Sequence, residues 1–314
     1  MKLLALALLA ALPLHAAPKK YPYMVTTTVG MVNDIVRNVA GDKAKVTALM
    51  GAGVDPHLYK PTRDDVAALL GADVVFYSGL MLEGKLADTL IKVGRSKPVF
   101  AVTELIDEQF LLEPEEMAGH ADPHVWMDPG AWAKAVEAVG KRLAEFDPAN
   151  AALYRMNAAA YAAKCVDMTA YGKKVLATVP ENSRVLISSH DAFNYFGRAF
   201  GLKVMGVQGI STESEAGLQS INALVDFIVK NEVKAVFVES SVSPKNIEAL
   251  VDGVKSRGKD LKIGGELFSD AMGAAGTYEG TYLGMLDHNI TLVARALGGE
   301  VPAAGNGGKL SHVN

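Results

Sequence analysis

Three histidines and one aspartate lie in segments whose residue types suit a metal site. His57 is in GAGVDPHLYKPT (residues 51–62), and His124 is in ADPHVWMDP (residues 121–129), so an Asp-Pro-His arrangement occurs twice. His190 is in LISSHDAFNYFGRAFGL (residues 186–202), and Asp270 is in IGGELFSDAMG (residues 263–273). Taken singly, each has an ordinary alternative as a solvated loop residue, a helix start or a helix cap. The repeated motif favours a ligand role, because rigid turns hold imidazoles at fixed positions.

These four side chains together have the composition of a closed tetrahedral metal shell. Three neutral imidazoles and one carboxylate satisfy Zn²⁺ at ligand distances of about 2.0 to 2.2 Å. A hydrolytic zinc normally keeps one position for water, whereas four protein ligands leave none. The set therefore favours metal capture over catalysis. The alternative from another class is a secreted zinc-dependent hydrolase that uses His190 as ligand or base beside Asp191, although the chain contains no HExxH motif. A surface adhesion protein is a third and less supported alternative.

Further acids are candidates for holding the histidine rings. A carboxylate bonded to the second ring nitrogen would fix the tautomer of a metal-binding histidine. Asp55, Asp122 and Asp128 are near the two Asp-Pro-His motifs, although helix or turn capping is the alternative for each. Glu239, at a strand end in VFVESS, is expected to orient a ligand or to bond the backbone near the cleft. His120 is expected to be solvated or to contact metal only transiently.

The elements that position these residues follow an alternating pattern. Short apolar runs alternate with helical periodicity in both halves, which predicts mostly parallel sheets covered by helices. The fold class is therefore α/β, with two lobes that each contain a mostly parallel four-stranded sheet flanked by helices. Because ligands bind beyond the carboxyl ends of parallel strands, the four residues are expected to meet in one cleft. The predicted strands are 23–28, 45–50, 74–77, 99–102, 184–188, 203–207, 235–238 and 262–263, and the predicted helices are 32–40, 64–70, 85–93, 131–146, 193–200, 218–231, 244–257 and 278–297.

A long alanine-rich run connects the halves. Residues 147–179 read as one helix, with Asp147 as its cap, Pro148 in its first turn and Pro180 at its end. At about 1.5 Å per residue it would span roughly 48 Å, so we expect a rigid spine. The predicted division is an N-terminal metal-binding lobe (18–146), the spine helix (147–180), a C-terminal metal-binding lobe (181–298) and a flexible tail (299–314).

The N-terminus and composition indicate an exported protein. Residues 1–17 contain Lys2, an apolar run from Leu3 to Leu14 and then small residues, which is typical of a cleaved signal peptide. The apolar run is shorter than a membrane span. Cys165 is the only cysteine, so no lipid-anchor cysteine lies at the cleavage point and we expect a periplasmic location. The net charge of −4 gives no basic patch for nucleic acid.

On these motifs, the chain resembles the periplasmic zinc/manganese-binding receptors of ABC importers, solute-binding protein family 9, and in particular their TroA-like and ZnuA-like members. The resemblance runs from about Val25 to Leu297, and it is dense at GVDPHLYKPT, DPHVWMDP, SSHDAFNYFGRAFGL, ESSVSPKN and GGELFSDAMG. It implies two lobes joined by one long helix, with the metal between them. It also implies that His57, His124, His190 and Asp270 bind the metal.

The resemblance further implies Zn²⁺, or alternatively Mn²⁺, as the transported ligand, an ABC permease and its ATPase as partners, and a monomer. Two departures bear on the metal. The loop from Glu113 to Asp122 holds only His120, unlike the histidine-rich loop of many zinc-specialised members. Manganese-selective members have Glu where this chain has His190. A nitrogen-rich site favours Zn²⁺, so zinc is expected first. Affinity is expected to weaken as pH falls through about 6.5.

Overall fold

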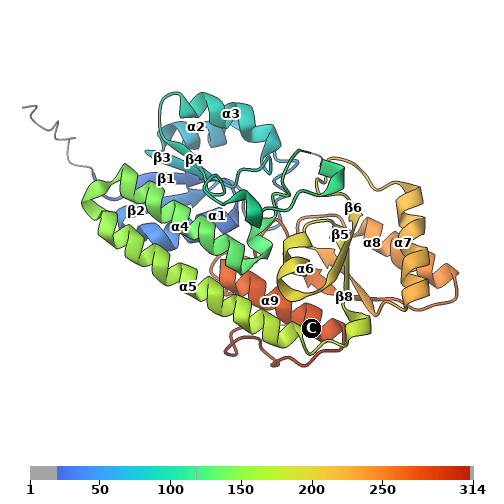
Figure 1. The fold of residues 1–314 in the computed structure, drawn as a ribbon. Helices are drawn as coiled ribbons and strands as arrows, with labels where there is room; N and C mark the ends of the chain where they lie inside the picture. The colour runs from blue at the N-terminus through green and yellow to red at the C-terminus, as the bar shows by residue number, and fades with distance from the viewer. Residues whose placement is uncertain (1–19, 118, 312–314) are drawn as a thin grey trace, which may run out of the picture.

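The N-terminal lobe is built on a parallel sheet of four strands. The computed structural model describes residues 20–117 and 119–311, so the predicted signal peptide (1–17) and the last three residues of the predicted tail lie outside the described part. The strand order is β2-β1-β3-β4, as Figure 1 shows. The strands are β1 (Tyr23–Thr27), β2 (Ala44–Ala48), β3 (Val74–Tyr77) and β4 (Val99–Ala101), and the helices are α1 (Gly30–Ala40), α2 (Arg63–Gly71), α3 (Ala87–Gly94) and α4 (Pro129–Phe146).

The C-terminal lobe differs from the expected four-stranded sheet. Its strands form two parallel pairs, β5 with β6 and β7 with β8, and β5 lies beside β7 without a continuous ladder between the pairs. At their ends a side chain joins the two strands instead, because the backbone N–H of His190 donates to the carboxylate of Glu239. The elements are β5 (Val185–His190), β6 (Lys203–Gln208), β7 (Ala235–Glu239), β8 (Lys262–Leu267), α6 (Asn194–Phe200), α7 (Leu218–Asn231), α8 (Lys245–Ser256) and α9 (Tyr282–Ala296).

Strand alternation gives each lobe two apolar layers. In β3, Val74 and Phe76 face a large core shared with the long helices, whereas Val75 faces a smaller cluster under α2 and α3. In the other lobe, Leu186 of β5 faces the shared core and Ile187 faces a cluster under α7 and α8. Successive side chains of a strand point to opposite faces, so both faces of each sheet are covered. The shared core therefore continues from one lobe into the other.

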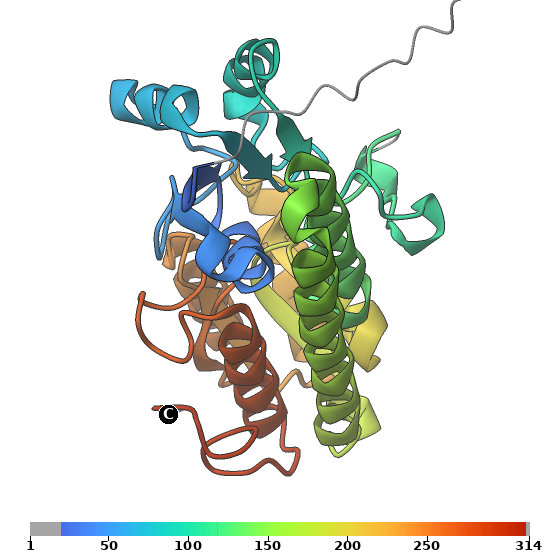
Figure 2. The ribbon, with the colours of Figure 1, turned by 90° about the vertical axis from the view of Figure 1, so that its left-hand side faces the viewer.

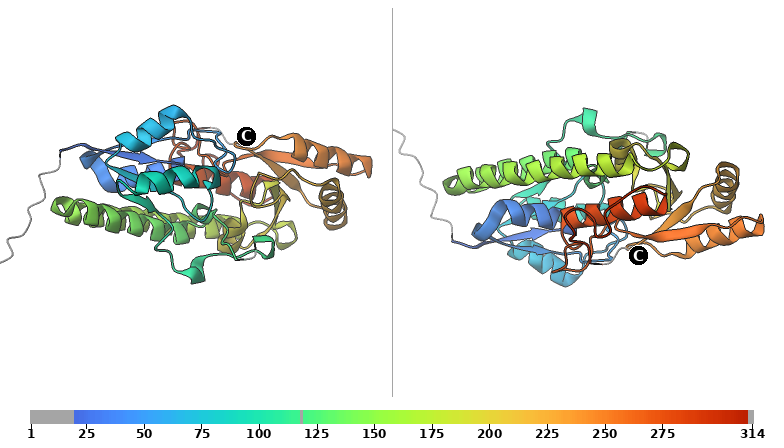
Figure 3. Two further views of the ribbon diagram at one scale, coloured as in Figure 1. Left: turned by 90° about the horizontal axis from the view of Figure 1, so that it is seen from above. Right: turned by 90° about the horizontal axis from the view of Figure 1, so that it is seen from below.

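The long helix α5 (Ala151–Leu176) forms the predicted connection but is shorter than expected. Its 26 residues span about 39 Å. It packs beside α4 and along both lobes (Figures 2 and 3). Near its start, Asn157 donates to the carbonyl of Val39 in the first lobe, and near its end Gly172 packs against Phe200 and Ile290 of the second.

Asp147 does not cap this helix, so that prediction is wrong. A short 3₁₀ turn precedes α5, and the Asp147 carboxylate instead accepts hydrogen bonds from the hydroxyls of Tyr21 and Tyr154 and from the amide of Asn150. At the start of α2, Thr62 and Asp65 form a reciprocal capping box. The 3₁₀ turns are Gly41–Lys43, Gly84–Leu86, Glu108–Phe110, Glu115–Met117, Val125–Met127, Pro148–Asn150 and Glu181–Ser183.

The described part of the predicted tail folds back on α9 rather than hanging free. The backbone N–H of Asn306 donates to the buried carboxylate of Asp287, and Ser311 bonds to Glu279. Leu310 is buried against the same region. Buried carboxylates hold charge at low cost only when donors reach them, and this segment supplies those donors. Within the described residues, no helix is both long and apolar enough to cross a membrane.

The contact between α4 and α5 generates a stability prediction. A Cβ added at Gly140 of α4 would lie 2.6 Å from the Cβ of Ala158 on α5, and neither atom can rotate away. We expect Gly140→Ala to lower the free energy of unfolding by about 1 to 3 kcal/mol, measured by urea denaturation. Gly71→Ala in α2, where nothing lies within 4 Å of the new Cβ, is the matched control. Equal stabilities of the two variants would contradict the close approach of these helices.

Candidate metal centre

The four residues singled out from the sequence lie together between the lobes. His57 is in the loop between β2 and α2, His124 directly precedes the 3₁₀ turn at Val125–Met127, and Asp270 follows β8. His190 is the last residue of β5, which extends two residues beyond the predicted strand. One ligand atom from each residue lies within 4.8 Å of all the others. The predicted convergence in one cleft is therefore present in the structure.

The spacing of these atoms fits a tetrahedral cation. The Nε2 atom of His124 lies 3.4 Å from that of His57 and 3.3 Å from that of His190. The Oδ1 atom of Asp270 lies 3.3 Å from the Nε2 atom of His124, and its Oδ2 atom lies 3.3 Å from that of His190 and 3.7 Å from that of His57, so both oxygens face the imidazoles. A tetrahedron with ligands about 2.0 to 2.1 Å from its centre has edges of about 3.3 to 3.4 Å. Three imidazoles and a carboxylate at these separations can surround one Zn²⁺-sized ion.

The Asp270 carboxylate has the features of an anion that needs a cation. It is 1 % exposed, and neither of its oxygens has a hydrogen-bond partner among the described residues. Burying an ionised carboxylate without donors is costly, so a positive charge must face it. Burial raises the pKa of Asp270, but the rings of His190 and His124 outweigh this and hold it well below its usual range. The ionised form is therefore the one that faces the histidines.

Buried acids lie next to the Nδ1 atoms of two of the imidazoles, on the side of each ring away from the other ligands. Asp122 accepts from the backbone N–H of His124 at 2.9 Å and lies 2.8 Å from its Nδ1. Glu239 accepts from the backbone N–H of His190 at 2.9 Å and lies 2.5 Å from its Nδ1. Such a carboxylate places the proton on Nδ1 and leaves the Nε2 lone pair for the metal. The expected roles of Asp122 and Glu239 as ring partners agree with this geometry.

His57 is held differently. Asp55 accepts from its backbone N–H at 2.8 Å, but the second oxygen of Asp55 accepts from Thr212 of the opposite lobe and not from the ring. Among the described residues the Nδ1 atom of His57 has no hydrogen-bond partner. The two Asp-Pro-His motifs therefore share a backbone turn and differ in what supports the ring.

Burial and the neighbouring acids shift the histidine pKa values in opposite directions. Burial lowers the pKa of His57 to about 4. Burial also disfavours charge on His124, but Asp122 and Asp270 raise its pKa to about 9. For His190, Glu239 and Asp270 outweigh burial and raise the pKa well above its usual range. Without metal at neutral pH, His124 and His190 therefore carry protons and His57 does not.

Trp126 links the centre to both lobes. Its ring lies 5.2 Å from that of His124, and its indole N–H donates at 2.9 Å to the carbonyl of Ser269, the residue before Asp270. The hydroxyl of Tyr282, in α9, donates to the carbonyl of Trp126. One side chain of the first lobe thus fixes the backbone beside the ligand of the second.

Other candidates from the sequence lie outside the cluster. Asp128 caps α4 and pairs with Arg198, so it supports no histidine ring. Asp191 bonds to Asn194 and is not the ring partner of His190. His120 is exposed in its loop, and His288 packs on Phe268. Thr212, which bonds to Asp55, and Tyr195, whose hydroxyl donates to the Asp122 carbonyl, could not be found from sequence patterns, because both come from the opposite lobe.

Comparisons with known proteins find a family and several similar proteins. The family model described as zinc-uptake complex component A, periplasmic, matches residues 25–296. The manganese-binding lipoprotein MntA of Bacillus subtilis is 46% identical over 273 residues, 87% of this chain and 89% of that protein. The zinc-binding protein TroA of Treponema pallidum is 44% identical over 274 residues, covering 87% and 88%. A solved structure of the periplasmic TroA from that organism superposes with a TM-score of 0.85 over 88% of this chain and 99% of that one.

The raised pKa values predict how metal binding depends on pH. A divalent ion held by all three Nε2 atoms must displace the protons of His124 and His190. We expect about two protons to be released per ion at pH 7, and the association constant to rise about 100-fold per pH unit from pH 6 to 8. Because these pKa values are raised, we expect metal affinity to fall already above about pH 6.5, the value near which an unperturbed imidazole would begin to lose it. Titration calorimetry in buffers of different ionisation enthalpy measures the proton count, and release of no protons would contradict the paired acids.

Proposed function

Because the chain belongs to the family of zinc-uptake complex component A, the metal-binding substrate-binding proteins of ABC importers, we propose that it captures one divalent transition metal with His57, His124, His190 and Asp270. The observation that carries the proposal is the convergence of three imidazole Nε2 atoms and a buried carboxylate at tetrahedral spacing. The captured ion is the cargo, which the protein passes to a membrane permease driven by an ATPase. Family membership removes the support for the hydrolase and adhesion alternatives.

The number of protein ligands indicates that the site captures a metal ion without catalysing a reaction. Four protein ligands complete a tetrahedral shell, so a bound ion keeps no position for an activated water. We propose that the protein is not an enzyme and that it works in the periplasm as a monomer, released from its signal peptide without a lipid anchor. The relatives include a periplasmic protein and a lipoprotein, and mass spectrometry of the mature chain distinguishes these two forms.

The donor set supports Zn²⁺ before Mn²⁺. Nitrogen-rich sites bind Zn²⁺ more tightly than Mn²⁺ in the Irving–Williams order, and the ligand spacing suits four-coordination. The named relatives divide between the two metals, with MntA described as manganese-binding and TroA as zinc-binding. Supply of the metal also influences which ion is carried, so affinity for both ions must be measured.

Exchange at His190 tests the ligand set and the metal together. We expect metal-stripped protein to bind one Zn²⁺ more tightly than Mn²⁺. In His190→Glu the new carboxylate would face Glu239, and the repulsion should weaken both metals at least about tenfold. Combining it with Glu239→Gln should remove the repulsion and shift preference toward Mn²⁺. His120→Glu, the same exchange at an exposed loop histidine, is the control. Zinc affinity that is equal in wild type and His190→Glu would contradict the site.

The spine predicts a small conformational change on binding. The helix α5 is packed against α1 of the first lobe and α9 of the second, and Trp126 bonds across the cleft. Movement therefore occurs as slight tilts and local loop shifts and not as wide hinge closure. Small-angle scattering of metal-free and zinc-loaded protein should give nearly superimposable profiles. A change in radius of gyration of several ångströms would be incompatible with this connection.

A further inference from the structure

A small cavity opens onto only one of the four proposed ligands. Its volume is about 180 Å³, and His57 is one of the residues that line it. We call this cavity the vestibule. Its walls come from both lobes and include Leu80 and Met81 on one side and Ile210, Ser211 and Glu213 on the other. His57 is 5 % exposed, whereas His124 and His190 are fully buried. An ion that enters or leaves through the vestibule therefore meets His57 first or last.

The support of the rings points to the same order. Acids bond the Nδ1 atoms of His124 and His190, whereas that of His57 has no such partner in the described part of the chain. The Nε2 atom of His57 is also farther from Asp270, at 3.7 Å against 3.3 Å for the other two rings. A histidine ring whose Nδ1 atom has no hydrogen-bond partner needs less free energy to change its orientation. Of the four proposed ligands, His57 can therefore rotate away from the metal most easily while the other three remain bound to it.

The wall of the vestibule contains a turn with unusual backbone angles. Gly79, Leu80 and Met81 have φ values of 94°, 52° and 65°. We call these three residues the gate turn. Residues with a side chain rarely adopt such angles, so the conformation at Leu80 and Met81 is strained. Met81 is 62 % exposed, and little packing opposes its movement.

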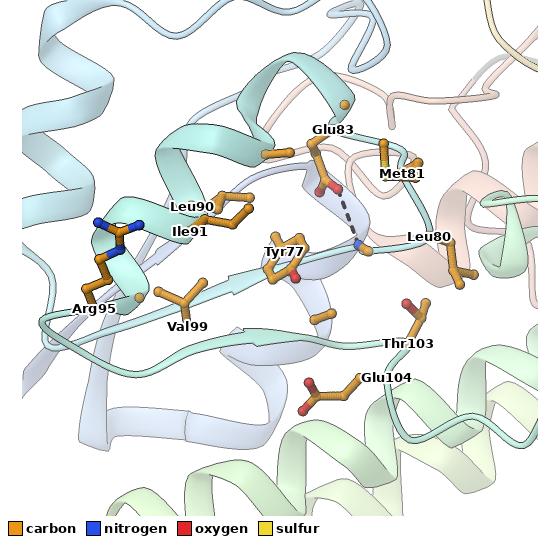
Figure 4. Close-up of a pocket in the computed structure, with 15 residues that line it drawn as sticks. Tyr77, Leu80, Met81, Glu83, Leu90, Ile91, Arg95, Val99, Thr103 and Glu104 are labelled. Atoms are coloured by element: carbon orange, nitrogen blue, oxygen red, sulfur yellow. Dashed lines mark hydrogen bonds between the residues drawn. The ribbon is translucent and has the colours of Figure 1, made fainter. Parts of the chain in front are cut away.

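The ends of the gate turn are fixed although its tip is not. The buried carboxylate of Glu83 accepts from the backbone N–H groups of Ser78 and Gly79 and from the hydroxyl of Thr28. Leu82 is fully buried and bonds to the carbonyl of Gly79. Figure 4 shows Leu80 and Met81 at one end of the pocket that it draws, and it shows Glu83 bonded to the backbone beside them. The turn can therefore change at two residues without unfolding the strand before it.

Behind the gate turn lies space into which it can retract. Leu80 and Met81 also border a groove of about 750 Å³ between α3 and β4, lined by Leu90 and Val99 and drawn in Figure 4. The same two side chains therefore border both the groove and the vestibule. Rotation of their side chains toward the groove would widen the vestibule in front of His57. Lys85, which follows Gly84 in the wall of the vestibule, pairs with Glu213 of the opposite lobe at 3.2 Å.

We propose that the gate turn controls the rate at which metal enters and leaves, and that exchange proceeds through the vestibule by way of His57. This inference rests on the proposed function. In its closed position the turn covers the path with Leu80 and Met81, and in its open position these side chains occupy the groove. Because the gate turn lies beside the path and supplies no ligand, it changes the rates of binding and release and leaves the equilibrium affinity the same.

The test is the rate of zinc release from zinc-loaded protein into excess chromophoric chelator, followed by stopped flow. Met81→Ala and Leu80→Ala should each increase the release rate about fivefold, as expected from loss of part of an apolar cover, with unchanged Kd. Ala87→Phe, which places a ring in the groove behind the turn, should slow release by a similar factor. Met156→Ala on α5 is the matched control, since Met156 is also 62 % exposed and does not line the vestibule.

The outcomes separate this inference from the function on which it rests. Faster release from both alanine variants with unchanged Kd, together with slower release from Ala87→Phe, supports the gate. Release rates equal to that of Met156→Ala, or a changed Kd at a constant release rate, overturn it. If wild-type protein binds no zinc by calorimetry, the proposed function fails before the gate is tested. Thermal denaturation of each variant checks that the exchange left the fold intact.

Discussion

The attraction between one buried carboxylate and a positive charge between three imidazoles is the interaction on which the centre depends. The buried carboxylate of Asp270 lies 3.3 Å from the Nε2 atoms of His124 and His190, so its charge must be balanced by protons on those rings or by a metal ion. Protons and metal therefore compete for the same atoms. This competition suits a receptor. Because the site is stable both when it is protonated and when it holds a metal ion, it can release the ion without unfolding.

The surrounding fold converts this balance into a defined geometry. His190 and Glu239 end two neighbouring strands, so the parallel arrangement itself brings ligand and ring partner together. Trp126 joins the backbone next to His124 to the backbone next to Asp270 through Ser269. The apolar core continues through α5 from one lobe to the other, and it holds the two lobes that carry the proposed ligands together.

Much of this arrangement is readable from the sequence, and the exceptions have a physical reason. Apolar runs and helix periodicity located nearly every element, and the residue types of His57, His124, His190 and Asp270 indicated their chemistry. Asp55 and Asp122 show the limit. They occupy the same place in two copies of one motif, yet only Asp122 bonds a ring, because Thr212 from the other lobe draws the carboxylate of Asp55 away. Local pattern likewise predicts Asp147 as a helix cap, but its carboxylate instead accepts hydrogen bonds from Tyr21, which is distant in sequence, and from Tyr154 within α5. Local patterns specify turns, whereas hydrogen-bond partners between distant segments are decided by packing.

The position of Trp126 has a spectroscopic consequence. The chain contains only two tryptophans, and both are fully buried, with rings 6.2 Å apart and that of Trp126 against His124. A protonated imidazole quenches the emission of an adjacent indole, and a d¹⁰ ion that replaces the proton removes that quencher. The protein thus carries its own fluorophore at the cargo site, and the occupancy of the site can be followed in unlabelled protein from its intrinsic emission.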